Sequence, residues 1–182
     1  FDSVGENRVQ EVIAKQEGYR DRLAWELIGH LQSNKANAAV VHFDRIQSVD
    51  SIKLLTKLQR IAGDRKRALG ILLQVNAGND PDKHGLDPED LDATVEHALK
   101  CDNLQLDGLM TIAPLSDDPD VARRTFSNLR EVRDRVNRDF GLRLDDLSMG
   151  MSGDLEIAIA EGSTCIRVGT ALLGPRAPRH EG

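Results

Sequence analysis

Two short stretches combine small residues, hydroxyl groups and a helix start in the manner of phosphate-binding sites. The first is SMGMSGDLEIA at 148–158, and the second is RVGTALLG at 167–174. The first N–H groups of a helix are unpaired and carry partial positive charge, and small residues let an anion approach them. The alternative is an N-cap with ordinary tight turns. The residues expected to form the cradle are Gly150, Ser152, Gly169 and Thr170.

The elements that would position this cradle alternate along the chain. Apolar runs of strand length lie at 1–6, 24–31, 45–51, 68–77, 104–113, 144–152 and 163–174. Amphipathic runs of helical pattern lie at 7–17, 33–42, 51–63, 88–100, 118–139 and 153–161. Asp118 and Pro119 resemble a cap and a first-turn proline, and Gly141 a C-terminal stop. Repeated strand–helix units predict a parallel sheet covered by helices.

The fold class expected is α/β, a (β/α)8 TIM barrel. No GxGxxG follows the first strand, which disfavours a dinucleotide-binding sheet. The chain has 182 residues and seven strand candidates, whereas such barrels have eight strands and typically about 250 residues. We therefore expect the first strand and an N-terminal helix to lie upstream of Phe1, since the strands at 1–6 and 163–174 would otherwise be open edges. Residues 1–174 are expected to form one domain and 175–182 a C-terminal tail.

A barrel of this kind carries its chemistry at the C-terminal ends of its strands, with the phosphate site after the last two. Arg167 lies in the last strand candidate between Ile166 and Val168, so its side chain faces the opposite side from theirs. An inward arginine needs a partner, because an unpaired buried charge is costly. Arg167 is therefore either half of a structural salt bridge or a donor to a ligand ring atom or phosphate.

Composition narrows the classes of function. The net charge of −6 disfavours a broad nucleic-acid-binding surface. No apolar run approaches the roughly 20 residues that span a bilayer, and no signal peptide is recognised, so we expect no membrane association. Cys101 and Cys165 form no metal or redox motif, which indicates a reducing, cytoplasmic setting and no metal site.

Five motifs together resemble the pyridoxal phosphate homeostasis protein family (YggS/PROSC type), whose members are similar to the barrel domain of alanine racemases. The motifs are VGENRVQE at 4–11, IGHLQSNK at 28–35, GLMTIAP at 108–114, SMGMSGDLEIAIAEGST at 148–164 and RVGTALLGPR at 167–176. Each alone is weakly specific, but they follow in order over nearly the whole chain. The resemblance implies a single, monomeric barrel that binds pyridoxal 5′-phosphate (PLP) as a Schiff base on a lysine.

The resemblance also implies roles for particular residues. Arg167 would face the pyridine nitrogen, and an arginine there keeps that nitrogen unprotonated and weakens the ring as an electron sink. Asn7 would lie near the Schiff base, its alternative being a helix cap. Met149 would pack on the ring, its alternative being an ordinary core methionine. Phosphate contacts would come from Ser152, Gly169 and Thr170, beside Gly150.

The lysine itself is the main departure from the family pattern. In the family it ends the first barrel strand, in a segment that precedes the GEN motif, and that segment would lie upstream of Phe1. The seven lysines of the sequence fall in predicted helices or loops, so none is assigned: Lys15, Lys35, Lys53, Lys57, Lys66, Lys83 and Lys100.

The function implied is intracellular PLP (vitamin B6) homeostasis without racemase turnover, with PLP-dependent apoenzymes as recipients. One rival is a barrel enzyme, an isomerase or lyase acting on a phosphorylated small substrate. Its candidate acid/base groups are Glu6, Asp50 and Asp107, which serve equally as caps or surface charges. A second rival is an interaction protein that has lost its cofactor. His30, Ser33 and Asn34 follow a strand end and are further candidates for the mouth, whereas His84 is expected to face solvent.

Overall fold

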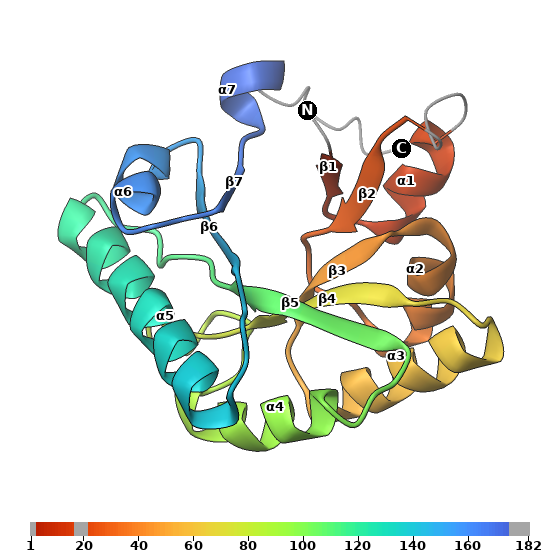
Figure 1. Ribbon diagram of the computed structural model, residues 1–182. Coiled ribbons are helices and arrows are strands. Elements are labelled where there is room, and N and C mark those ends of the chain that lie inside the picture. Colours follow the sequence, from red (N-terminus) through yellow and green to blue (C-terminus); the bar gives the residue numbers. More distant parts are fainter. Residues whose placement is uncertain (1–2, 17–21, 175–182) are drawn as a thin grey trace.

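Seven parallel strands form a single curved sheet in the computed structural model, which describes residues 3–16 and 22–174 (Figure 1). Their spatial order follows the sequence, as in a (β/α) barrel. The strands are β1 (Ser3–Glu6), β2 (Ala24–Leu27), β3 (Arg45–Val49), β4 (Leu69–Gln74), β5 (Leu104–Met110), β6 (Asp146–Met151) and β7 (Cys165–Arg167). The expected fold class is confirmed.

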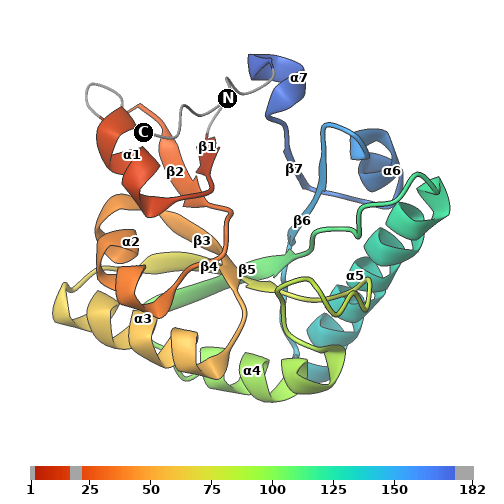
Figure 2. The same ribbon diagram turned by 180° about the vertical axis from the view of Figure 1, so that it is seen from behind.

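Helices surround the sheet on its outer side, and the view from behind shows the same ring (Figure 2). The α-helices are α1 (Val9–Lys15), α2 (Ala36–His42), α3 (Ile52–Asp64), α4 (Leu91–Ala98), α5 (Pro119–Phe140), α6 (Leu155–Ala160) and α7 (Thr170–Leu173). Two 3₁₀ turns, η1 (Ser33–Lys35) and η2 (Pro88–Asp90), precede α2 and α4. None of the helices in the described ranges is long and apolar enough to cross a membrane.

Helix boundaries follow the local chemistry of the sequence. In α5 the Asp118 side chain accepts a hydrogen bond from the Asp120 N–H, Pro119 occupies the first turn, and Gly141 ends the helix with a left-handed φ of 64°. These are the expected signals, and they are confirmed. In α3 the Ser51 hydroxyl accepts from the Leu54 N–H in the same capping role.

The hydrophobic core lies between the outer face of the sheet and the helices. Ile46, Ile71 and Leu147 supply the strand side, and Leu58 and Phe126 supply the helix side, all fully buried. Leucine, isoleucine and phenylalanine each gain about 1.5–3 kcal/mol from such burial. This layer holds the strands in fixed register, so that their C-terminal ends meet at one rim.

The last predicted strand is shorter than expected. The run at 163–174 was expected to be one strand, but β7 covers only Cys165–Arg167 and α7 begins at Thr170. Gly169 lies between the two elements, and the chain turns there into a helix. Within the described residues β1 and β7 each pair on one side only, so both are edge strands. The expected tail, 175–182, lies outside the described residues.

Gly108 marks the closest approach between neighbouring strands. A Cβ at Gly108 would lie 2.0 Å from the main-chain oxygen of Asp146, its partner across the β5–β6 pair. We expect Gly108→Ala to lower the free energy of unfolding by about 1–3 kcal/mol, because the backbone must shift. Urea denaturation measures the loss. Gly153→Ala is the matched control, since a Cβ there meets nothing within 4 Å; equal losses in the two variants would contradict the prediction.

Candidate functional site

Arg167 is directed into the barrel, as alternation along the last strand predicts. Its side chain reaches past β6, where Nη1 donates to Ser148 Oγ at 2.8 Å and Nη2 donates to the Thr111 main-chain oxygen at 2.8 Å. Arg167 is 9% exposed, whereas its neighbour Ile166 is 38% exposed on the opposite face. Both acceptors are neutral. Among the described residues no carboxylate forms an ion pair with Arg167, so within them the salt-bridge alternative has no partner.

Burial has an electrostatic consequence for this guanidinium. Removal from water lowers the pKa of Arg167, and the nearby charges of Cys165 and Asp154 offset this only in part. A buried cation that has only neutral partners is costly to the fold. A ligand that presents a negative charge or a lone pair would relieve that cost. Arg167 is therefore the residue whose environment points most directly to a bound group.

The two turns expected to form the cradle lie side by side. The Ala171 N–H, in the first turn of α7, donates to Ser152 Oγ at 3.3 Å, which joins the turn after β6 to the turn after β7. A Cβ on Gly153 or Gly169 would meet nothing within 4 Å, so both glycines border open space. Among the turn and loop hydrogen bonds of the described residues, the N–H groups of Gly153 and Gly169 donate to no other residue. These donors remain available to an anion.

Gly150 has a different reason for being glycine. Its φ is +93°, and a Cβ would lie 2.4 Å from Cβ of Ala158 in α6. The missing side chain therefore lets α6 pack closely on β6, which sets the position of the turn that follows. Gly150 shapes the cradle from behind, and close approach of a ligand is not needed to explain it.

Met149 and Asn7 are placed differently from each other. The Met149 side chain is fully buried in the core between sheet and helices, so the core-methionine alternative describes it. Asn7 follows β1 and is exposed, and its main-chain oxygen packs against Gly29 beyond β2. It does not cap α1, whose N-cap residue is Arg8. Asn7 instead borders an open hollow of about 600 Å³ together with His30 and Lys35.

A chain of polar side chains runs through the barrel interior below Arg167. Ser148 Oγ donates to Gln47 Oε1 at 2.5 Å, and Gln47 Nε2 donates in turn to Glu26. Glu26 accepts from Arg45 Nε at 2.8 Å, and Arg45 also contacts Asp146. Sequence reasoning missed this chain, although part of its signal was present: Arg45 and Gln47 flank the apolar Ile46 in the strand at 45–49.

The carboxylates proposed for an isomerase or lyase do not converge. Glu6 is buried beside α1 and pairs with Lys15 Nζ at 2.6 Å. Asp107 lies 3.9 Å from Arg45 at the N-terminal end of the interior, away from the rim. Only Asp50 reaches the rim, where it pairs with His30. This arrangement gives the rival no acid/base pair from these three residues.

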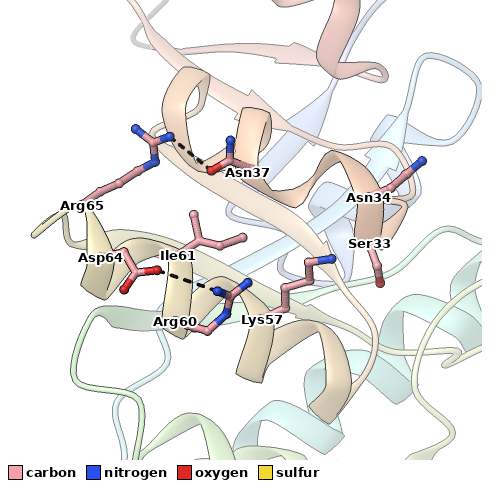
Figure 3. A pocket seen from close by; sticks show the side chains of 8 residues that line it. All are labelled: Ser33, Asn34, Asn37, Lys57, Arg60, Ile61, Asp64 and Arg65. Atoms are coloured by element: carbon pink, nitrogen blue, oxygen red, sulfur yellow. Dashed lines mark hydrogen bonds and ion pairs between the residues drawn. The ribbon is translucent and has the colours of Figure 1, made fainter.

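Ser33 and Asn34 lie outside the mouth. They border a polar surface hollow of about 450 Å³ between η1, α2 and α3 (Figure 3). There Arg65 donates to Asn37 Oδ1 at 3.2 Å, and Arg60 lies 3.9 Å from Asp64. Ser33 is the first residue of η1 and does not cap it. The hollow is on the helical side of the barrel, so it is not part of the rim site.

Asp107 makes the stability of the folded protein depend on pH. Burial raises the pKa of Asp107, although the charge of Arg45 opposes the rise. The folded state therefore holds a proton more tightly than the unfolded state, and Asp107 costs stability as pH rises above the ordinary aspartate range near about 4. We therefore expect the difference in melting temperature, Asp107→Asn minus the parent protein, to become larger as the pH rises from about 4 to about 7. Asp145→Asn, at an exposed position, is the control; a constant or falling difference for Asp107→Asn would contradict this.

Comparison with known proteins places the chain in a family. The alanine racemase N-terminal domain family model matches residues 1–177. A pyridoxal phosphate homeostasis protein of Pseudomonas aeruginosa is 43% identical over 175 residues, covering 94% of this chain and 74% of that protein. Its counterpart in Aquifex aeolicus is 41% identical over 173 residues, covering 94% and 76%.

Solved structures with a similar fold include PipY, which is also similar in sequence, and an alanine racemase. PipY of Synechococcus elongatus, with PLP bound, has 47% identity and a TM-score of 0.86, covering 93% of this chain and 80% of PipY. An alanine racemase of Clostridium difficile has a TM-score of 0.81 at 16% identity, covering 97% of this chain and 46% of the racemase. The latter likeness shows the fold alone. The chain belongs to the alanine racemase N-terminal domain family, and its relatives in Pseudomonas aeruginosa and Aquifex aeolicus are named pyridoxal phosphate homeostasis proteins.

Proposed function

We propose that the protein binds PLP at the C-terminal rim of the barrel and acts in PLP homeostasis. The observation that carries the proposal is Arg167: a buried guanidinium with neutral partners, two residues before the open turn at Gly169. The names of the relatives and the PLP-bound PipY structure support the same ligand. The residues present therefore fit a group that combines a phosphate with a basic ring nitrogen.

Each element of the rim has a separate task in this proposal. The N–H groups of Gly153 and Gly169 hold the phosphate together with the Ser152 hydroxyl, and the start of α7 adds its partial positive charge. Arg167, held by Ser148 and the Thr111 oxygen, directs N–H groups toward the ring nitrogen. A guanidinium does not give up its proton, so the ring nitrogen stays unprotonated. When bound, PLP supplies an aldehyde that condenses with amines and a ring that, so placed, is a weak electron sink.

We further propose that a lysine outside the seven discussed above holds PLP as a Schiff base. In the structure all seven lysines lie in helices, in η1 or in loops, and none ends a strand. Borohydride reduction after PLP loading, followed by peptide mass spectrometry, identifies the lysine. We expect the residues encoded before Phe1 to include an apolar run that ends in the modified lysine. An adduct on one of the seven lysines would contradict this assignment.

The proposal assigns storage and delivery to the protein, without racemase turnover. The relatives in Pseudomonas aeruginosa and Aquifex aeolicus, at 43% and 41% identity, are named homeostasis proteins, whereas the alanine racemase, at 16% identity, resembles this chain only in fold. We place the protein in the cytoplasm as a monomer, with PLP-dependent apoenzymes as recipients. Chiral chromatography of L-alanine incubated with the PLP-loaded protein tests the absence of turnover. Formation of D-alanine above the rate with free PLP would contradict it.

Substitution of Arg167 tests the ligand site directly. We expect Arg167→Met to weaken PLP binding at least tenfold in equilibrium dialysis, because the ring nitrogen loses its donor. Arg167→Lys is expected to retain part of the affinity, since it keeps the charge. Arg143→Met, at a position whose side chain is 89% exposed, is the matched control. Unchanged affinity in a folded Arg167→Met protein would overturn the proposed orientation of PLP.

A further inference from the structure

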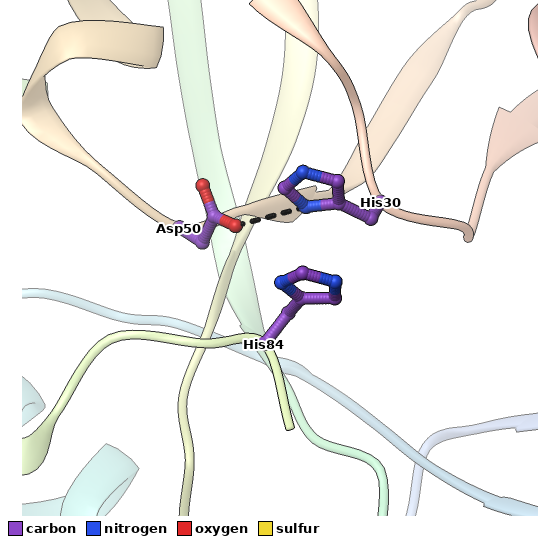
Figure 4. A group of neighbouring side chains, drawn as sticks. All are labelled: His30, Asp50 and His84. Atoms are coloured by element: carbon purple, nitrogen blue, oxygen red, sulfur yellow. Dashed lines mark ion pairs between the residues drawn. The ribbon is translucent and has the colours of Figure 1, made fainter. Parts of the chain in front are cut away.

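The loops after three consecutive strands bring two imidazoles and a carboxylate together. His30 follows β2, Asp50 follows β3, and His84 lies in the loop after β4 (Figure 4). His30 Nδ1 lies 3.1 Å from Asp50 Oδ2. The rings of His30 and His84 stack with centroids 3.9 Å apart and an interplanar angle of 11°. The three residues offer ligand atoms that all lie within 4.8 Å of one another.

These separations are close to what one transition-metal ion requires. Nitrogen and oxygen ligands bind Zn²⁺ at about 2.0–2.2 Å, which places two tetrahedral ligands about 3.4 Å apart. The His30–Asp50 pair already has this spacing. His84 is exposed, so its ring is free to turn from the stacked position toward a shared ion. Two imidazoles and a carboxylate are a ligand set typical of zinc, with a fourth position left for water.

The main chain around the three residues is anchored by buried contacts. Gln74 Nε2, 4% exposed, donates to the His84 main-chain oxygen at 2.9 Å and so fixes the loop after β4. The buried Ser48 hydroxyl donates to the Gly29 oxygen at 2.6 Å, directly before His30. The residue after Asp50 caps α3. Each ligand therefore comes from a position that the barrel core holds in place.

We propose that His30, Asp50 and His84 form a binding site for a divalent transition-metal ion, with Zn²⁺ as the best-matched ion. The site belongs to the loops after β2, β3 and β4, whereas the phosphate cradle belongs to the turns after β6 and β7. His84 is exposed, as the sequence predicts, and the proposal departs from the expectation that the chain has no metal site. The proposal does not depend on PLP and is tested without it.

Isothermal titration calorimetry, with Zn²⁺ titrated into the PLP-free protein, is the primary test. We expect one equivalent to bind, with affinity reduced at least tenfold in His84→Ala and in His30→Ala. His97→Ala is the matched control, because His97 lies on α4 and bonds only Thr56 among the described side chains. Circular dichroism confirms that each variant is folded. Absence of binding, or equal affinity in all three variants, would overturn the site and leave His30 and Asp50 as an ion pair only.

Cobalt provides a second and independent measurement. Co²⁺ in a site with imidazole and carboxylate ligands gives a visible absorption whose intensity reports coordination number. We expect the band in the parent protein and its loss in Asp50→Asn, because the amide does not replace the anionic ligand. A band that persists in Asp50→Asn would exclude Asp50 as a ligand. Neither titration involves Arg167, so failure here leaves the PLP proposal standing and the converse also holds.

Discussion

The arrangement of side chains inside this barrel depends on how the buried positive charge of Arg167 is stabilised. Arg167 cannot shed its proton, and the described interior offers it a hydroxyl and a carbonyl oxygen. Ser148 is held in turn by Gln47, and Gln47 by Glu26, which also accepts from Arg45. Each group orients the next, so the direction of the guanidinium is decided by residues on β2, β3 and β6 as much as by β7.

The two ends of this polar chain have different balances of charge. At the N-terminal end Arg45 is surrounded by Glu26, Asp107 and Asp146. Burial alone would lower the pKa of Arg45, but the hydrogen bond and charge of Glu26 and the charge of Asp146 raise it. At the rim Arg167 has no such carboxylate among the described residues, and burial lowers its pKa. Carboxylates thus surround Arg45, whereas the described partners of Arg167 are a hydroxyl and a main-chain oxygen.

Most of the fold and part of the site could be predicted from sequence. Strand–helix alternation and the caps of α5 depend on local patterns, which single residues such as Asp118 and Gly141 reveal. Alternation also placed Arg167 inside. The role of Met149 was ambiguous, because a methionine beside a glycine-rich turn suits both core and ligand. The stacking of His84 on His30 could not be predicted, since it depends on how the loop after β4 folds toward the end of β2.

The shortness of β7 links ligand affinity to the order of the chain itself. This strand has three residues and carries Arg167, and in the described part of the chain it pairs only with β6. A group that bridges the turns at Ser152 and Gly169 would fasten together two segments that the Ala171 N–H to Ser152 Oγ hydrogen bond, at 3.3 Å, joins at the rim. Part of the intrinsic binding energy is then used to immobilise the edge of the sheet. With such a group, ligand occupancy and the rigidity of the β7 edge would rise together. Release of the ligand would leave a less rigid edge whose backbone amide hydrogens exchange more rapidly with water.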